Sequence, residues 1–327
     1  MAVQDLSKFA YVTLVMKGDS YVPGALVLAS SLRRTGSSVD SVCMVTPDVS
    51  DAAQRVLGML YTKVVITDYT RAKVCKMKSK TSRRMEQLYF TMWPTILTKF
   101  NCLDLEGYTN VCLLDADVVV LRCMDAIFAT GTLAGSFHNY YVHDESNPYP
   151  RDMKTGDIVP RDTIIKASTL ENSFLVSGSP LILPVHRDIL SQFKTYIEDI
   201  QEKHGFIGFP HMCAGVDETT ITMFFTDVLK EEWRYIGLEY ACVPWKDSQS
   251  EPYLYHYVHK KPWTMEEGTW PDLTPWFHEA HWICKEYPSA EKFFNLKSSV
   301  NTSEDKDDDK LGGLLVQLKL MSEDRRC

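Results

Sequence analysis

The stretch of sequence that decides the fold is FAYVTLVMKGDSYVPGALVLASSLRR, residues 9–34. Residues 9–16 are almost all apolar, β-branched or aromatic, which predicts a buried strand. After a short polar turn, small and apolar side chains recur at helical spacing from Pro23 to Arg34. The stretch therefore predicts a β-α unit, the building block of α/β sheets.

The same alternation continues downstream. The pattern predicts strands at residues 39–45 and 63–69, with a helix at residues 50–60 between them. Strands separated by helices favour a parallel sheet with right-handed crossovers. A helix is expected next at residues 86–100, and an apolar strand follows it at residues 110–114.

The second half of the chain has a weaker pattern. Residues 138–172 are rich in Tyr, Pro, Asp and His without a clear period, so we expect a loop or an irregular hairpin there. A strand is predicted at residues 175–183, and helices at residues 187–202 and 218–226. Asp217 is a suitable cap for the last of these helices.

Bulk composition narrows the classes of function. The chain has 327 residues, 45% of them hydrophobic, which is enough for one main globular domain. Its net charge of −8 argues against a nucleic-acid partner, because phosphate binding needs a basic face. Cys43, Cys102 and Cys112 lie in apolar runs, as reduced thiols do. Without a signal-peptide pattern or a run of about 18 apolar residues, we expect a cytoplasmic protein with no membrane span.

Several other segments have a biased composition. Seven of the fourteen residues 71–84 are Lys or Arg, which is typical of a solvated loop or of a lid that closes over a diphosphate. Six of the seven Trp fall between Trp233 and Trp282, which is typical of a core or of a surface on which sugars stack. Residues 298–310 predict an acidic disordered linker, and residues 311–327 hold a short apolar segment that could dock on the domain or on a partner.

Two carboxylates stand where the strand at residues 110–114 ends, in VCLLDADVVV. Asp115 and Asp117 are two residues apart, so in an extended chain they point to the same side. Paired carboxylates bind hard divalent cations, and open α/β sheets bind ligands at this end of their strands. The alternative is that the two residues only hydrogen-bond a turn or cap the next helix, and spacing alone leaves both interpretations open.

Several segments, taken in order, resemble glycosyltransferase family 8, the glycogenin-like family. They cover most of residues 9–263, and they read AYVTLVMKGDSYVPGALVLASSL, TKF, LLDADVVV, VSGSPLIL, GVDETTITMFF and HYVHKKPW. The resemblance implies a single GT-A type nucleotide-sugar-binding domain at residues 1–297. That fold is α/β, with a central, mostly parallel mixed sheet flanked by helices.

The resemblance also implies a metal site. Asp115 and Asp117 would bind Mn²⁺ or Mg²⁺ with His256 as the third protein ligand, and an imidazole beside carboxylates favours Mn²⁺. Lys261 would hold the donor's diphosphate, which suits a point charge. Without the resemblance, His256 would be read as a structural histidine and Lys261 as a surface lysine beside a Pro-Trp turn.

Further residues match positions that contact the donor in the family. Tyr21 would stack on the uracil base, and the backbone of residues 13–15 would edge the same pocket. Lys99 and Asp217 are the catalytic candidates: Lys99 would touch the donor sugar and a metal-binding aspartate, and Asp217 would hydrogen-bond the sugar near its anomeric carbon. The complete donor set implied by the resemblance is Thr13, Leu14, Val15, Tyr21, Lys99, Asp115, Ala116, Asp117, Ser177, Gly178, Asp217, His256, His259 and Lys261.

Three positions depart from the family pattern. Val176 replaces the Asn of an Asn-Ser-Gly motif, Glu218 replaces the Gln after the key Asp, and His259 stands where Gly is usual. These changes spare the metal and diphosphate residues and bear on the identity of the donor sugar. Residues 240–255 hold no clear counterpart of the family's acceptor tyrosine, so self-glucosylation is not expected.

The implied function is metal-dependent, retaining transfer of a hexose, glucose or galactose, from a UDP-sugar to an acceptor that the sequence does not name. One alternative is a nucleotide-sugar or glycan-binding regulatory protein that has lost transfer. A nucleotidyltransferase would need a Gly-rich phosphate loop, and residues 17–19 are too sparse for one. Relatives often form dimers, so a homodimer is compatible with the resemblance.

Overall fold

The computed structural model describes residues 6–76, 91–137, 148–150, 152–244, 251–258, 260–294 and 296. The predicted linker at residues 298–310 and the apolar segment at residues 311–327 lie outside this part of the chain, as does much of the basic stretch at residues 71–84.

The N-terminal part alternates strands and helices as the sequence predicts. Its elements are β1 (Phe9–Val15), α1 (Val22–Arg34), β2 (Asp40–Val45), α2 (Asp51–Leu60) and β3 (Lys63–Ile66). β1 pairs with β2 and β2 pairs with β3, both in parallel. The third strand ends at Ile66 instead of residue 69.

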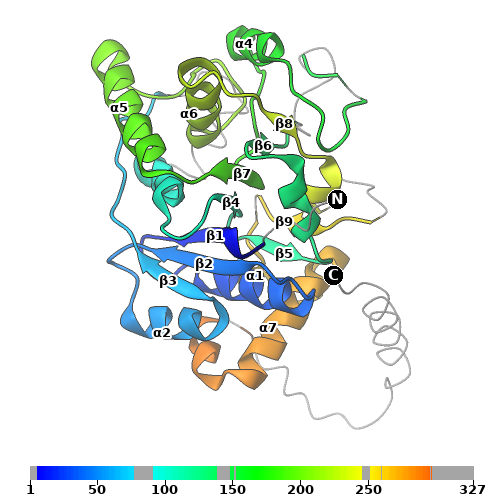
Figure 1. Cartoon of the computed structure of the whole chain (residues 1–327). Coiled ribbons are helices and arrows are strands. Elements are labelled where there is room, and N and C mark those ends of the chain that lie inside the picture. Colours follow the sequence, from blue (N-terminus) through cyan, green and yellow to red (C-terminus); the bar gives the residue numbers. More distant parts are fainter. Residues whose placement is uncertain are drawn as a thin grey trace.

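The seven-stranded sheet is mixed and mostly parallel, which confirms the predicted fold class. Its order is β3-β2-β1-β4-β7-β6-β8 (Figure 1). The four strands not yet introduced are β4 (Asn110–Leu113), β6 (Ala134–Gly135), β7 (Leu181–Pro184) and β8 (Arg234–Tyr235). β4 is parallel to β1, whereas β7 is antiparallel to both of its neighbours. A separate two-stranded antiparallel sheet joins β5 (Val118–Val120) to β9 (Leu254–His256).

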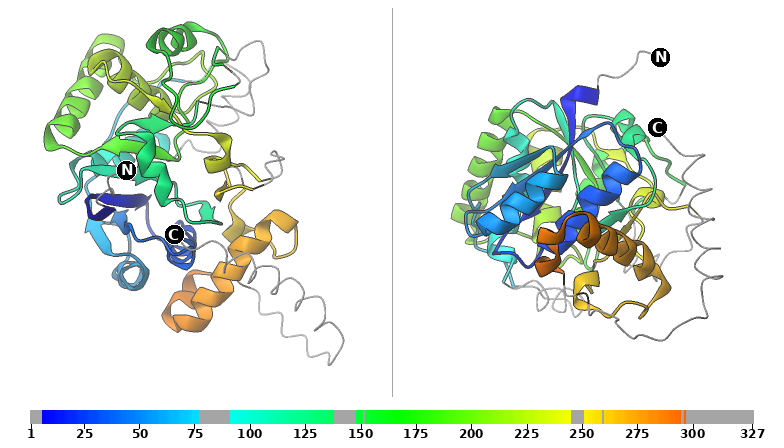
Figure 2. Two further views of the ribbon diagram at one scale, coloured as in Figure 1. Left: turned by 45° about the vertical axis from the view of Figure 1, so that its right-hand side comes forward. Right: turned by 90° about the horizontal axis from the view of Figure 1, so that it is seen from below.

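Alternating side chains of the parallel strands cover both faces of the sheet. On β2, Val42 and Met44 join one core cluster, and Cys43 and Val45 join another. The second cluster lies against α1, α2 and α7 (Thr274–Glu286), which share one side of the sheet in Figures 1 and 2. β1, β2 and β4 are buried on both faces, which explains why their sequences are continuous apolar runs.

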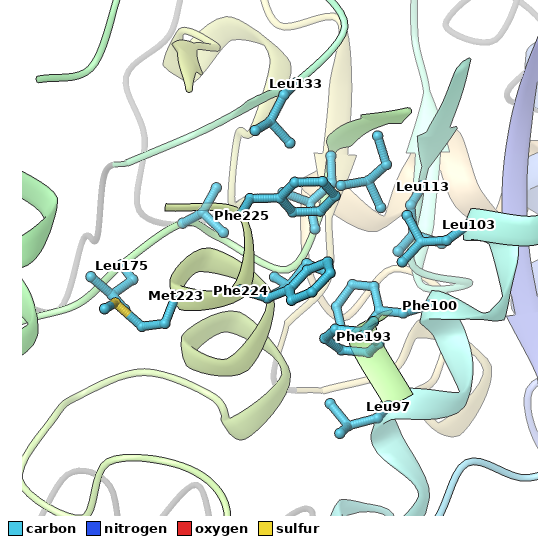
Figure 3. Close-up of a cluster of buried hydrophobic side chains, with 14 of the residues drawn as sticks. Leu97, Phe100, Leu103, Leu113, Leu133, Leu175, Phe193, Met223, Phe224 and Phe225 are labelled. Carbon is cyan, nitrogen blue, oxygen red and sulfur yellow. The ribbon is translucent and has the colours of Figure 1, made fainter. Parts of the chain in front are cut away.

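The opposite side of the sheet carries the larger core. It packs a 3₁₀ helix (Trp93–Asp104) against α5 (Arg187–His204) and the segment after α6 (Val216–Met223). Aromatic rings interlock there: Phe193 lies 5.4 Å from Phe100 and 5.1 Å from Phe224 between ring centroids (Figure 3). The position of Lys99 on the 3₁₀ helix is therefore fixed by deep packing.

Two predicted elements in the middle of the chain are wrong in detail. Residues 138–172 contain a helix, α4 (Arg161–Thr169), which buries only Ile164 and Ala167, so its apolar stripe is too thin to show a period. The helix predicted at residues 86–100 is a 3₁₀ helix from Trp93 onward within the described residues.

Further differences concern where elements begin. The strand predicted from residue 175 starts at Leu181, after Pro180, which has no N–H for a ladder. Gly215 is the N-cap of α6, and Asp217 lies within its first turn, where a carboxylate suits the helix dipole. Residues 224–228, predicted as part of that helix, form a π-helical turn.

The two readings of the tryptophan-rich region can be compared with burial. Trp233 and Trp276 are fully buried, which confirms the core interpretation for these two rings.

Within the described ranges, no helix combines the length and apolar character needed to cross a bilayer.

Candidate functional site

Three side chains form the centre of the site. One ligand atom each from Asp115, Asp117 and His256 lies within 4.8 Å of the others. His256 Nε2 is 3.2 Å from Asp117 Oδ1 and 3.6 Å from Asp115 Oδ2. Two carboxylates and an imidazole are a donor set that suits Mn²⁺, so the residues fit a divalent metal ion.

Strand pairing brings these residues together. The two aspartates lie between β4 and β5, and His256 closes β9. β5 and β9 are antiparallel with Val118 opposite His256, and the N–H of Tyr257 donates to the Asp117 carbonyl at 2.9 Å. The two-stranded sheet therefore sets the imidazole beside carboxylates that are about 140 residues away in sequence.

Lys261 supplies a positive charge to the buried Asp117. Its ammonium forms an ion pair with Asp117 Oδ2 and donates to the carbonyls of Tyr257 and Val258 at 3.1 and 3.3 Å. Burial alone would raise the pKa of Asp117, but the charges of Lys261 and His256 hold that pKa well below its usual range. Asp117 therefore stays ionised, as a metal ligand must.

Lys99 links the candidate metal site, formed by Asp115, Asp117 and His256, to Asp217. Its Nζ lies 2.7 Å from Asp115 Oδ1 and 3.0 Å from Asp217 Oδ2. Burial alone would lower the pKa of Lys99, but the two carboxylates raise it well above its ordinary value. The lysine is therefore a fixed cation that orients both aspartates.

Gly178 lies next to the charged ends of Lys99, Asp217 and Glu218. A Cβ atom built on Gly178 would lie 3.3 Å from both Asp217 Oδ2 and Lys99 Nζ, and 3.6 Å from Glu218 Oε1. The N–H groups of Gly178 and Gly215 donate to the two carboxylate oxygens of Glu218 at 3.0 and 2.6 Å. A larger residue at position 178 would crowd the three charged ends.

Tyr21 stands at the other end of the site, as the residue before α1. Its ring meets the indole of Trp263 edge-on, with 5.4 Å between centroids. Trp263 follows Lys261 by two residues, so the predicted base contact and the predicted diphosphate contact are coupled through one aromatic pair. Trp263 belongs to the HYVHKKPW segment of the family resemblance, but the sequence alone does not predict that its ring contacts Tyr21.

The predicted base-pocket backbone lies on β1. β4 ends opposite Val12, so residues 13–15 run past the last residue of β4 that pairs with β1. The Thr13 hydroxyl is buried and has no hydrogen-bond partner among the described residues. Among the described residues, no hydrogen bond or ion pair joins Thr13, Leu14 or Val15 to Asp115, Asp117 or His256, although Val15 and Ala116 belong to the same buried apolar cluster.

Ser179 was not expected from the sequence. Its hydroxyl accepts a hydrogen bond from the N–H of Asp115 at 3.0 Å, so it holds the first aspartate in position. Ser177, which was expected, donates its N–H to the Ser136 carbonyl at 2.7 Å. Ala116 is buried between the aspartates, and His259 lies outside the described residues.

Comparison with known proteins gives partial matches in sequence. No protein-family model matches the chain. It is 27% identical to the uncharacterized protein R707 of Acanthamoeba polyphaga mimivirus over 209 residues, 62% of this chain and 63% of that protein. It is 33% identical to human glycogenin-1 over 119 residues, 36% of this chain and 32% of glycogenin-1. The chain thus spans less than two thirds of each relative.

Comparison of folds extends over most of the chain. The crystal structure of the galactosyltransferase LgtC, in complex with donor and acceptor sugar analogs, superposes with a TM-score of 0.52 and 12% identity. The match covers 86% of this chain and 100% of LgtC. At this identity the likeness establishes the architecture, which is GT-A.

Proposed function

The chain is a glycogenin-like member of glycosyltransferase family 8, and from this premise we propose that it transfers a hexose from a UDP-sugar to an acceptor with retention of anomeric configuration. The donor hexose is glucose or galactose. The observation that carries the proposal is the continuous polar chain from Lys261 through the metal cluster and Lys99 to Asp217. This chain of contacts joins the candidate metal site to Asp217, whose carboxylate can face a donor sugar.

A metal ion held by Asp115, Asp117 and His256 would offset the negative charge that grows on the leaving diphosphate. Lys261 would add a second positive charge at the same place. Its present ion pair with Asp117 keeps its ammonium at the cluster, within reach of a phosphate oxygen.

The reaction proceeds on one face of the sugar. The bond from the anomeric carbon to the diphosphate oxygen breaks, and its electron pair stays on that oxygen. The acceptor hydroxyl bonds to the anomeric carbon on the same face, and its proton passes to the departing phosphate oxygen. Asp217, held by Lys99 at 3.0 Å, would stabilise the positive charge that develops on the sugar.

The second candidate is a binding protein that has kept the fold and lost transfer. The changes at Val176, Glu218 and His259 favour it, because the first two fall in segments that match the family's donor-sugar pocket and the third replaces the family's phosphate-side Gly. Against it stand a complete metal-ligand set and the two lysines that neutralise it. A protein that only binds sugars has less need of them.

The test is a panel of UDP-sugars, with binding and hydrolysis measured with and without Mn²⁺ in the native chain and in Asp117→Asn. Glu198→Asn on the exposed face of α5 serves as a control for the loss of one charge. Metal-dependent turnover that the Asp117 variant lacks supports the transferase and names its donor. Metal-dependent binding with no turnover for any donor would favour the binding protein, and no binding of any UDP-sugar would refute both the transferase and a nucleotide-sugar-binding protein.

A further inference from the structure

Glu218 lies at the sugar end of the proposed site, but the reaction described above gives it no task. Its carboxylate is held rigidly, because each oxygen accepts one backbone N–H, from Gly178 at 3.0 Å and from Gly215 at 2.6 Å. These two glycines belong to separate segments, so the carboxylate cannot turn away without losing a hydrogen bond to one of them.

The charge of Glu218 is only partly balanced, because Lys99 is the one cation among the described residues that lowers its pKa, and Lys99 is already shared between two other carboxylates. Lys99 is shared between Asp115 and Asp217, at 2.7 and 3.0 Å. No Lys, Arg or His among the described residues forms an ion pair with Glu218, whose carboxylate accepts hydrogen bonds from the N–H groups of Gly178 and Gly215. Burial and the neighbouring Asp217 raise the pKa of Glu218 to about 7, so the group is mostly ionised at pH 8.

The contacts of Lys99 indicate where Glu218 lies relative to a bound UDP-sugar. Lys99 touches Asp115 of the metal site and also approaches Gly178, beside Asp217 and Glu218. A sugar attached to a diphosphate at the metal site would therefore lie near this second group of charges. Any ionised substituent on that sugar would meet Glu218 in a partly desolvated site.

We propose that Glu218 selects the donor by charge, so that the site accepts neutral UDP-hexoses and rejects UDP-uronates. This inference rests on the proposed function. Glucuronate differs from glucose by a carboxylate in place of a hydroxymethyl group, so the two sugars have similar size and differ chiefly in charge. An added anion beside Glu218 and Asp217 is repelled, and a neutral hydroxyl is not.

The experiment measures dissociation constants at pH 8 with Mn²⁺ for UDP, UDP-glucose, UDP-galactose, UDP-glucuronate and UDP-xylose. UDP-xylose is neutral and lacks the sixth carbon, so it separates exclusion by charge from a requirement for that carbon. The variants are Glu218→Gln, which removes the charge at nearly constant size, and Glu198→Gln, which removes one exposed charge on α5.

We expect the native chain to bind UDP-glucuronate at least about tenfold more weakly than the better of the two neutral hexose donors. Glu218→Gln should reduce this ratio at least about threefold, and Glu198→Gln should leave it unchanged. Equal or tighter native binding of UDP-glucuronate overturns the inference even if the variant does not fold. A ratio unaffected by Glu218→Gln also overturns it. Absence of UDP binding by the native chain overturns the proposed function, and the inference with it.

Discussion

The indole of Trp263 lies so close to Gly24 that a methyl group on this glycine would come within 2.5 Å of Cζ3 and 2.7 Å of Cη2. The same methyl group would overlap the carbonyl oxygen of Ala116, between the two aspartates. Trp263 also touches Tyr21 and follows Lys261 in sequence. The first turn of α1 is therefore the point where the segments that carry the residues predicted to bind the base, the metal ion and the diphosphate meet.

Gly24→Ala should weaken binding of UDP with Mn²⁺ at least about tenfold, because overpacking here displaces either the indole or the Asp-Ala-Asp turn. Calorimetric titration measures the effect. Gly58→Ala on α2 is the matched control, since a Cβ there meets nothing within 4 Å. The control should bind normally and gain roughly 0.5–1 kcal/mol of stability. Native affinity in Gly24→Ala would show that this contact does not position the site.

Lys99→Met should lower the free energy of unfolding of the metal-free protein by roughly 3–5 kcal/mol, because it leaves Asp115 and Asp217 without their buried cation. Mn²⁺ should then raise the melting temperature more in the variant than in the native chain, since the metal ion supplies part of the missing charge. Thermal unfolding with and without Mn²⁺ measures both effects, with Lys194→Met on the exposed face of α5 as control. Equal Mn²⁺ shifts in variant and native chain would contradict the argument.

The sequence predicts the fold best where burial makes a pattern. β1, β2, α1 and α2 were predicted within one or two residues because strands buried on both faces and helices buried on one give strong signals. The two-residue strands β6 and β8 give no signal, because they are too short to have a period. Such short strands are specified by their neighbours in the sheet.

The site residues also differ in how far the sequence predicts them. Asp115 and Asp117 could be singled out from their place after a buried strand, but His256, Lys261, Lys99 and Asp217 were named only through the family resemblance. The structure brings all six into one cluster. The supporting contacts could not be found from sequence alone, because each joins segments whose proximity depends on the whole fold.

Ser179→Ala tests one of these supporting contacts. Its hydroxyl accepts the Asp115 N–H across 64 positions in sequence, and its loss frees the turn that carries this predicted metal ligand. The Mn²⁺ dissociation constant should rise about tenfold, as for other groups that orient a metal ligand. Ser168→Ala on α4, where the hydroxyl bonds only the local Ile165 carbonyl, should leave metal binding unchanged. Similar Mn²⁺ affinities in the two variants would assign Ser179 no part in the site.

Stability should depend on pH through Glu218. Burial and Asp217 raise the pKa of this carboxyl from an ordinary 4.5 to about 7, so between these two values the folded chain binds more protons than the unfolded chain. Its contribution to stability is therefore fully present below pH 4.5 and is lost as the pH rises through 7, by up to roughly 1.4 kcal/mol per pH unit.

Glu218→Gln cannot titrate, so the native chain should lose stability relative to this variant as the pH rises from 5 to 8. The glutamine keeps one acceptor and presents an amide to the second N–H, so the absolute stabilities will also differ through hydrogen bonding. Only the charge produces a difference that changes with pH, and denaturant unfolding at several pH values isolates it. Glu198→Gln should give a curve parallel to the native one. If Glu218→Gln also runs parallel to the native chain, the carboxyl titrates near its ordinary pKa, and burial and Asp217 act on Glu218 less strongly than the geometry indicates.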